Sequence, residues 1–409
     1  MSPFLPTERG FDFVFSGKSV TKPSATEGGK GEFEQTAKAM EFMEKNKAQP
    51  FFLYVPYDNP HVPLAVLPEQ AAGVLDPFNP IYSATVETLD VVVGKLLKKI
   101  EELGIAENTI VIFASDNGGL HVPELNVSAP TYCKPYRAGK GLVYEGGIRV
   151  PFMVRWPGKI TPGVENVPVS IADLFATLGD ILEVPQMTSP DFVSLKPLLL
   201  GKGNMADRPF YWHMPNYTNQ GGRPSGAIRE GDWKLVEQYE DGKLELYQLQ
   251  NDPGEKTDVS AQEPGRVAAM RGKLETWRRS VKAQMPKVNP DYEPAMWKAC
   301  YETVDVSRLE AREKASDMDG FLGPWRKTMT AVASAGSKQI PQSNYASPIP
   351  NLDHKPDAVY GQIILWGLSG DLHANKLRHE PQPEKDTLGF WVDETDWVSW
   401  ECEVPQAGK

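Results

Sequence analysis

Hydrophobic residues follow two different spacings in the first part of the chain. Short continuous apolar runs at residues 51–55, 109–114 and 152–156 predict buried strands. From Thr85 to Leu103 the apolar residues instead recur at every third or fourth position, which predicts an amphipathic helix, and Gly104 is suited to end it. Strands that alternate with helices predict the α/β class, with a doubly wound, mixed sheet.

A second helix and a different kind of sheet follow. Ser170 is placed to begin a short helix. Further along, the runs 227–236 and 244–247 flank Asp241-Gly242, which is a strong hairpin signal. Residues 263–281 then predict another helix. The sequence therefore predicts a small antiparallel sheet, followed by a helix, after the α/β core.

The last part of the chain differs in composition. Residues 331–350 are rich in Ser, Pro, Gly and Ala, which predicts a linker. Beyond them, residues 388–391 and 396–401 alternate like strands and resemble the start of a galactose-binding-like carbohydrate module, although too little chain follows for a whole β-sandwich. Aromatic residues at this spacing belong more often to a core than to a sugar platform. We expect four parts: an α/β core at 1–204, a C-terminal subdomain at 205–295, a helical extension and linker at 296–350, and a partial β-sandwich-like tail at 351–409.

Composition limits the classes of protein and of partner. With 409 residues, 40% of them hydrophobic and 24% charged, the chain is large enough for two or three domains. Its net charge of -11 argues against nucleic acid or an anionic membrane as a partner. Its three cysteines are too few and too scattered for a disulfide framework or a zinc cluster. No apolar run approaches the ~20 residues of a membrane helix, so we expect no membrane span.

The run at 109–114 leads directly into Asp116 and Asn117, which two glycines follow. Open α/β sheets keep their ligand sites at the carboxyl ends of strands. A carboxylate beside an amide carbonyl offers oxygen ligands and no nitrogen or sulfur, which favours Ca²⁺ or Mg²⁺ over Zn²⁺. Asp-Asn-Gly is also ordinary turn chemistry, so a surface turn without a metal is the alternative interpretation.

Two further motifs place a basic side chain among prolines or glycines. His61 stands in the motif Asn-Pro-His-Val-Pro-Leu, directly after the run at 51–55. Lys140 stands in the motif Arg-Ala-Gly-Lys-Gly, and Glu-Gly-Gly-Ile-Arg follows at residues 145–149. A single histidine among prolines is commonly a packed structural residue, and a single lysine is commonly only solvated. The order of the motifs is what favours a functional role for both.

In this order the motifs resemble those of the sulfatase family, specifically the arylsulfatase-like members of the alkaline-phosphatase superfamily. The resemblance covers roughly residues 5–295 and implies the family's fold and activity. It identifies the chain as a sulfuric ester hydrolase acting on sulfated carbohydrates or aryl sulfates. It also implies a periplasmic or extracellular location.

The resemblance assigns roles to individual residues. Asp116 and Asn117 would be ligands of one Ca²⁺ ion. His61 would hydrogen-bond the bound sulfate, and Lys140 would neutralise charge on the sulfate oxygens. The motif at 145–149 is interpreted as structural, with one buried ion pair between its Glu and its Arg that holds the Lys140 loop.

The family's nucleophile is a formylglycine made from the first residue of a Cys/Ser-x-Pro-x-Arg segment. Cys133-Lys134-Pro135-Tyr136-Arg137 matches this bare pattern. It lacks the Ser/Thr-Gly that the family's segment requires, and it follows His61 in the chain, whereas the family's segment precedes it. We therefore expect Cys133 not to be a nucleophile.

Family members carry an Asp-Asp metal pair, the formylglycine segment and a Gly-Lys-Trp-His-Leu-Gly type stretch ahead of everything seen here. The opening at Phe4-Leu5-Pro6 resembles the segment that follows that stretch. We expect a sulfatase that lacks its amino-terminal portion, with an incomplete sheet, and that is inactive as it stands.

Two other functions stay open. One is a phosphodiesterase or phosphonate hydrolase of the same superfamily. Those relatives usually place His after the Asp of the metal loop and bind zinc or manganese, so Asn117 favours the calcium sulfatases. The other is a non-catalytic binding protein built on the remnant of the fold. The sequence leaves the oligomeric state and the exact sulfated substrate open.

Overall fold

The structure of the protein is a computed structural model. It describes residues 6–16, 23–24, 26–76, 78–124, 128–184, 191–201, 203, 205–288, 292–310 and 312–339, together with four short strands between residues 371 and 399. The chain forms two compact units, one made of residues 1–292 and 301–324 and the other of residues 293–300 and 325–409, and each is described by itself.

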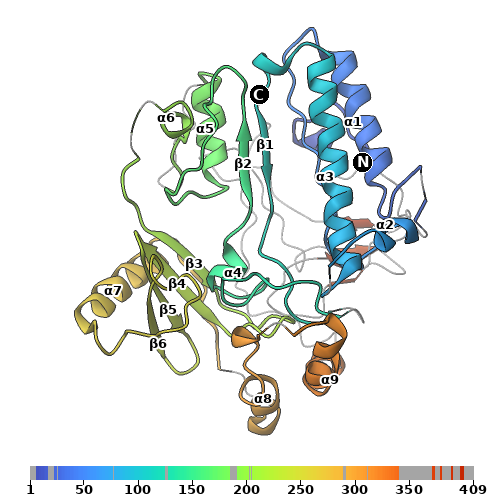
Figure 1. The fold of residues 1–409 in the computed structure, drawn as a ribbon. Helices are drawn as coiled ribbons and strands as arrows, with labels where there is room; N and C mark the ends of the chain where they lie inside the picture. Colours follow the sequence, from blue (N-terminus) through green and yellow to red (C-terminus); the bar gives the residue numbers. More distant parts are fainter. Residues whose placement is uncertain are drawn as a thin grey trace. The chain divides into compact units, whose positions relative to one another are not determined.

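Two long helices of the first unit, α1 (Glu32–Asn46) and α3 (Pro80–Glu102), lie side by side (Figure 1). α3 confirms the predicted amphipathic helix. It begins earlier than predicted because the Asn79 side chain accepts a hydrogen bond from a backbone N–H of the first turn at 3.1 Å. Gly104 follows the helix with a φ of +69°, as expected of a glycine that ends a helix. Helix α1 was not predicted from the sequence.

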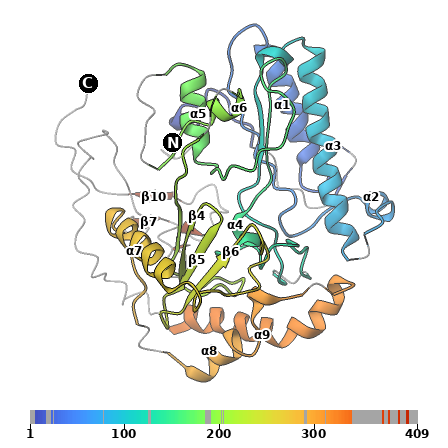
Figure 2. The same ribbon diagram turned by 60° about the vertical axis from the view of Figure 1, so that its left-hand side comes forward.

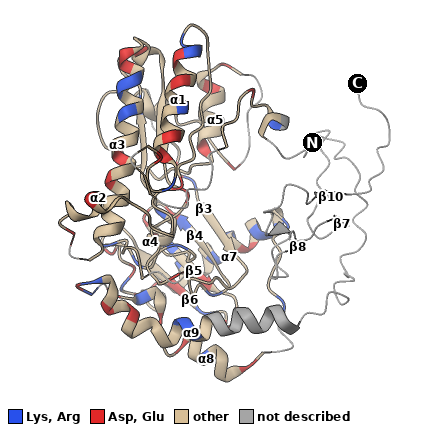
Figure 3. Ribbon diagram, turned by 90° about the vertical axis from the view of Figure 1, so that its right-hand side faces the viewer, with Lys and Arg blue, Asp and Glu red and all other residues tan. Residues whose placement is uncertain are grey.

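Charges of both signs are interspersed along α1 and α3 (Figure 3). Lys99 of α3 lies 2.8 Å from a carboxylate oxygen of Glu44 on α1. The ammonium of Lys95 lies 4.7 Å from the centre of the Phe33 ring. Exposed ion pairs contribute only about 0–1 kcal/mol each. These charged contacts therefore add little to the association of the two helices.

β1 (Val111–Ala114) and β2 (Phe152–Arg155) form an antiparallel pair, which confirms two of the predicted strands. β1 is half-buried rather than buried, because it has a neighbouring strand on one side only among the described residues. The third predicted strand, at 51–55, forms no regular secondary structure and pairs with no described strand, and Phe52 and Tyr54 are each 65% exposed. The prediction of a buried strand there was wrong, since an apolar run forms a strand only where another strand takes its backbone hydrogen bonds.

A four-stranded antiparallel sheet runs in chain order: β3 (Phe210–Met214), β4 (Ser225–Glu230), β5 (Trp233–Gln238) and β6 (Leu244–Gln248). It confirms the predicted hairpin, in which Gly242 has a φ of +70°. The predicted run 227–236 is divided between β4 and β5 by a turn at Gly231.

The two faces of this sheet have different covers. Helix α7 (Pro264–Ser280), which confirms the predicted helix, lies across one face, called the α7 face below (Figure 2). Its cluster of buried residues consists of Ile228, Leu235, Leu246, Met270 and Leu274. The opposite face is covered by a loop and is called the loop face. Its cluster consists of Leu142, Val143, Tyr144, Ala227, Val236, Tyr247 and Leu249. Side chains along each strand alternate between the two faces, as the pleat requires.

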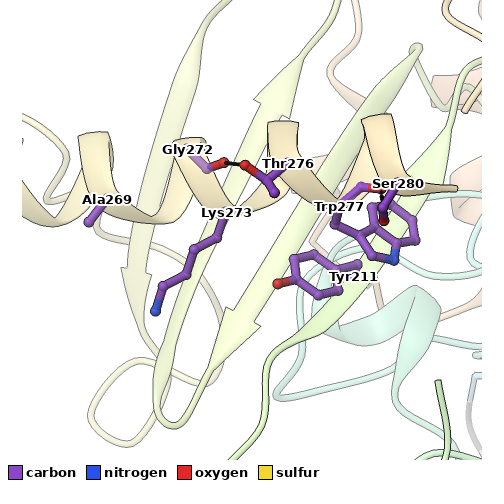
Figure 4. Close-up of a pocket in the computed structure, with 7 residues that line it drawn as sticks. All are labelled: Tyr211, Ala269, Gly272, Lys273, Thr276, Trp277 and Ser280. Carbon is purple, nitrogen blue, oxygen red and sulfur yellow. Dashed lines mark hydrogen bonds between the residues drawn. The ribbon is translucent and has the colours of Figure 1, made fainter. Parts of the chain in front are cut away.

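A hollow of about 630 Å³ lies beside α7 and β3 (Figure 4). Tyr211 and Trp277 line it, and their rings stack with centroids 4.8 Å apart and planes within 5°. Lys273 at the same hollow is paired with Glu230. Tyr211 lies opposite Ile228 in the β3–β4 ladder, so the hollow belongs to the α7 face.

Several shorter helices complete the described part of the chain. They are η1 (Pro6–Arg9), α2 (Pro68–Ala72), η2 (Ala106–Asn108), α4 (Glu145–Ile148), α5 (Asp173–Ile181), α6 (Lys196–Leu199), α8 (Pro294–Tyr301) and η3 (Val306–Arg308). α5 confirms the helix predicted after Ser170, whose hydroxyl accepts a hydrogen bond from the backbone N–H of Ala172 at 3.2 Å. Within the described ranges, no helix combines the length and the apolar character needed to cross a membrane.

The predicted linker was wrong over residues 331–339, which belong to helix α9 (Ala315–Gln339). Alanine, lysine and glutamine in this stretch favour helix, and tertiary context commonly overrides the weak preference of Ser and Gly for loops. Residues 340–350 lie outside the described residues. The second unit also has two antiparallel strand pairs, β7 (Asp371–His373) with β10 (Trp397–Ser399) and β8 (Arg378–His379) with β9 (Leu388–Gly389). The four-part domain division and the carbohydrate-module assignment stay predictions.

His121 is a buried histidine that the sequence analysis overlooked. It is 1% exposed, its Nε2 lies 3.0 Å from the backbone oxygen of Val306, and its Nδ1 has no hydrogen-bond partner. A carbonyl oxygen only accepts, so Nε2 carries the proton and the ring is neutral. Burial lowers the pKa of His121 from 6.5 to about 4, although the hydrogen bond to Val306 acts in the opposite direction.

This neutral histidine predicts sensitivity to acid. The unfolded chain takes up a proton on this ring near pH 6.5 and the folded chain only near pH 4, so stability is lost as the pH falls through this window. His121→Gln keeps a donor for Val306 and cannot titrate. Over that window we expect the variant to lose about 3 kcal/mol less unfolding free energy than the native protein. Urea titrations at several pH values test this, and parallel losses in both proteins would contradict it.

Candidate active site

His61 and Lys140 meet although they lie 79 positions apart in the sequence: Lys140 Nζ is 2.9 Å from His61 Nε2. The His61 side chain is exposed and Lys140 is half-buried, so the contact is accessible from solvent. Across the described residues, no carboxylate lies within ion-pair distance of Lys140. Its positive charge is therefore not neutralised by a direct ion pair.

Hydrogen bonds determine which nitrogen of His61 carries the proton. Nδ1 lies 2.5 Å from the backbone oxygen of Val62, and because a carbonyl only accepts, Nδ1 is the donor. Nε2 then has a free lone pair, which accepts a hydrogen bond from the Lys140 ammonium. The site thus presents a neutral imidazole directly beside a cation.

Lys30 is a second cation at this place, and the sequence analysis missed it. Its side chain is 9% exposed, and its Nζ lies 2.5 Å from Asp58 Oδ2 and donates to the backbone oxygen of His61 at 2.6 Å. The Glu32 carboxylate accepts from the backbone N–H of Lys30 at 2.7 Å. These contacts hold the His61 loop against the start of α1. Nothing in the sequence around Lys30 marks it, because its partners lie about thirty residues further along.

Asp116 and Asn117 form the turn directly after β1. Asp116 Oδ1 accepts a hydrogen bond from Asn117 N at 2.8 Å, and Asn117 Nδ2 donates to Gly118 O at 2.9 Å. The other side-chain oxygens, Asp116 Oδ2 and Asn117 Oδ1, accept no hydrogen bond from any described residue. These two oxygens suit a hard cation such as Ca²⁺, but they are fewer than the roughly 6–8 that calcium takes. Over the described ranges, no three His, Cys, Asp or Glu side chains form a metal-binding group.

The turn at 116–119 and the loop at 137–147 touch through their backbones. The Lys140 N–H donates to the turn at 2.9 Å, and the Gly118 N–H donates to the loop at 3.0 Å. A Cβ at position 118 would lie 1.7 Å from the backbone oxygen of Gly146, so a side chain does not fit there. The contact brings Lys140 to the same end of β1 as the proposed metal ligands.

Glu145, at the start of α4, is buried as predicted, but its main partner differs from the prediction. Arg149 NH1 lies 3.8 Å from Glu145 Oε2, and the Arg149 side chain is 50% exposed. Lys234 of β5 is fully buried, and its Nζ lies 3.1 Å from Glu145 Oε1. The buried ion pair therefore joins the Lys140 loop to the sheet.

Cys133 lacks the features of a reactive thiol. Its Sγ donates to Gly119 O at 3.6 Å, and burial raises the pKa of the thiol. A raised pKa keeps sulfur in its protonated, less nucleophilic form. These observations agree with the expectation that Cys133 is not the nucleophile.

Comparison with known proteins identifies the family. The sulfatase family model matches residues 5–184, and a model of the C-terminal part of N-sulphoglucosamine sulphohydrolase matches residues 138–280. This chain belongs to the sulfatase family. The first match contains His61, Lys140 and the Asp116-Asn117 turn.

Individual sulfatases support the assignment. A sulfatase of Formosa agariphila is 36% identical over 270 residues, which cover 57% of this chain and 47% of the relative. An N-acetylgalactosamine-6-O-sulfatase of Bacteroides thetaiotaomicron is 32% identical over 267 residues, which cover 59% of this chain and 50% of the relative. The chain thus spans about half the length of these curated relatives.

A solved structure shows the same fold. The crystal structure of Ps i-CgsB in complex with k-i-k-neocarrahexaose matches with 27% identity and a TM-score of 0.55, covering 71% of this chain and 65% of that one. The likeness confirms the predicted α/β fold of the sulfatase type.

The close approach at Gly118 predicts the effect of a substitution. Gly118→Ala forces a methyl group against the Gly146 carbonyl, so we expect a loss of at least about 2 kcal/mol of unfolding free energy. Gly94→Ala is the control. A Cβ added at Gly94 of α3 would have no atom within 4 Å, and alanine favours helix. Denaturant titration measures both. Equal effects of the two changes would show that the contact at Gly118 does not matter.

Proposed function

We propose that this sulfatase-family protein is a sulfuric ester hydrolase in which Lys140 and His61 bind the sulfate group of the substrate. The observation that carries the proposal is the Lys140 ammonium, 2.9 Å from His61 and without a carboxylate partner among the described residues. An accessible cation whose charge is not locally neutralised favours an anion, and a sulfate ester offers several acceptor oxygens to its N–H groups.

Lys140 would act on charge that develops during the reaction. As the bond between sulfur and the leaving oxygen breaks, its electron pair stays on that oxygen, so negative charge grows on the leaving alcohol beside sulfate oxygens that are already charged. An ammonium already held in place stabilises this charge without reorganising. Lys140 is suited to the task because its backbone N–H is bonded to the turn that follows β1.

His61 would assist the leaving alcohol, but in its present form it cannot protonate it. Its proton is on Nδ1 and bonded to Val62, so Nε2 must first gain a proton. The protonated group at hand is Lys140, 2.9 Å from Nε2. We therefore treat the two residues as one proton-transferring pair.

We further propose that Asp116 and Asn117 are ligands of one Ca²⁺ ion. Sulfatases generally use a metal, and the oxygen-only donor pair supports calcium over zinc. Bound there, Ca²⁺ would supply positive charge that offsets the charge of the sulfate oxygens.

The substrate class we propose is a sulfated carbohydrate or an aryl sulfate. One relative is named an N-acetylgalactosamine-6-O-sulfatase, and a solved structure of similar fold holds k-i-k-neocarrahexaose. A periplasmic or extracellular site of action stays the predicted location.

Binding of 4-nitrophenyl sulfate to the 409-residue chain tests the proposal. We expect Lys140→Ala and His61→Ala each to weaken binding by about tenfold or more, because each removes a hydrogen-bonding group from the sulfate site. Lys134→Ala is the matched control, since it removes one exposed positive charge from the segment just before the Lys140 loop. An equal loss in Lys134→Ala would mean that the anion responds to net charge alone and would refute the site.

We expect this binding to occur without turnover in the chain as printed. Its match to the family's nucleophile pattern is Cys133, whose thiol is partly buried and has a raised pKa. Release of 4-nitrophenol that disappears in Cys133→Ala would contradict this.

Calcium binding gives a separate prediction. Two side-chain oxygens cannot complete a calcium shell, so titration calorimetry of this chain should show a dissociation constant of roughly 10⁻⁴ M or weaker, raised further in Asp116→Asn. Tight, stoichiometric binding would reveal a calcium site other than the one proposed.

A further inference from the structure

The Lys140 loop, residues 137–145, is held at both ends by charged side chains that are buried against the loop face of the sheet. Arg137 at one end is 7% exposed and Glu145 at the other is 2% exposed. Their partners come from the sheet, from the segment that follows β6 and, for Arg137, also from Ser307 of η3. The arrangement is costly, because each charge has to leave water.

At the first end, Arg137 binds the sheet through several groups. Its NH1 donates to Tyr247 Oη at 2.8 Å and lies 3.6 Å from Glu245 Oε2. Its guanidinium carbon lies 3.6 Å from the centre of the Tyr144 ring. Burial alone would raise the pKa of Glu245, but the charge of Arg137 and the other hydrogen bonds lower it to about 2, so this carboxylate is charged.

At the second end, two carboxylates share one ammonium. Lys234 Nζ lies 3.1 Å from Glu145 Oε1 and 2.9 Å from Glu255 Oε1. The other oxygen of Glu255 accepts a hydrogen bond from the backbone N–H of Glu145 at 2.7 Å. Lys234 and Glu255 are both 0% exposed. Glu145 is therefore held by its side chain and by its backbone at once.

Between these two ends stands Lys140. Its ammonium has no carboxylate partner in the described part of the chain, so its position depends on the backbone that carries it. The contact with His61 spans 2.9 Å, a length that a small shift of the loop would break. Apolar side chains could replace the buried charges at the ends of the loop at no loss of stability. An ammonium shared by two carboxylates, in contrast, fixes the direction and the distance of each carboxylate.

We propose that Lys234 and Glu255 are positioning residues, which act through Glu145 to set where Lys140 Nζ stands relative to His61 Nε2. Their effect on sulfate binding rests on the proposed function, but their effect on the His61 contact does not. The four-stranded sheet is therefore part of the site, although neither residue touches the sulfate.

Glu255→Gln is the decisive variant. The neutral amide can accept from only one of its two partners, so either Lys234 or the backbone N–H of Glu145 loses its acceptor. Glu237→Gln is the matched control. Glu237 is 5% exposed and belongs to β5, the strand that also carries Lys234, but it pairs with Arg271 and Arg278 on the α7 face. Both variants should lose stability, and only the first should disturb Lys140.

The readout is nitrogen NMR of the full chain with labelled histidine. The chain has six histidines, and His61→Ala identifies the signals of His61. In the native protein His61 Nε2 should show the shift of an unprotonated nitrogen that accepts a hydrogen bond. We expect this signal to move in Glu255→Gln and to stay in Glu237→Gln. A folded Glu255→Gln with the native His61 signal would overturn the proposal.

Affinity for inorganic sulfate separates this proposal from the proposed function. We expect Glu255→Gln to weaken it about tenfold and Lys234→Arg to retain more affinity than Lys234→Met. If Lys140→Ala leaves sulfate affinity unchanged, the sulfate site is wrong, and the His61 signal still decides the positioning role. If Lys140→Ala weakens binding while folded Glu255→Gln binds as the native protein does, the positioning role is wrong and the sulfate site stands.

Discussion

Backbone contact between the turn after β1 and the Lys140 loop is the constraint on which the site depends. The turn is not part of a helix or strand, and the segment it meets is the Lys140 loop with the short helix α4 that follows, so backbone groups of the two segments pair with each other. The N–H of Lys140 donates to the turn, and the N–H of Gly118 donates to the backbone oxygen of Gly147 in α4. Such an approach leaves no room for a Cβ at position 118. The proposed metal ligands and the proposed sulfate ligand thus owe their common location to backbone geometry rather than to any attraction between their side chains.

The charges around this contact show why Lys140 is suited to an anion. On the loop face of the sheet, Arg137 is matched by Glu245, and Lys234 is shared by Glu145 and Glu255. These cations serve buried carboxylates and are not available to a ligand. Lys140 differs, because it is accessible and its hydrogen-bond partner is a neutral imidazole. A chain whose net charge is -11 repels anions overall, so an anionic substrate depends on local cations of this kind.

Features that lie within one short segment could be predicted from the sequence, whereas contacts between residues far apart in the chain could not. Motif order was enough to single out His61 and Lys140, and the turn after β1 was visible as Asp-Asn-Gly. The partners Lys30 and Lys234 were not, because an ion pair between distant segments leaves no mark in either one.

Errors in the secondary structure have the same origin. The apolar run at 51–55 has the composition of a buried strand, yet burial depends on neighbours that composition does not describe. Residues 331–339 contain Ser and Gly, which are common in loops, yet they continue helix α9, and their alanines, lysine and glutamine favour helix. Which nitrogen of His61 carries the proton could not be predicted from the sequence either, since it follows from the position of the Val62 carbonyl.

The position of the Val62 carbonyl has a chemical consequence. With Nδ1 committed to Val62, any proton that His61 delivers must pass through Nε2, the atom that faces Lys140. Binding of the sulfate and delivery of the proton would then draw on the same ammonium, so a shift of the Lys140 loop would impair both steps together.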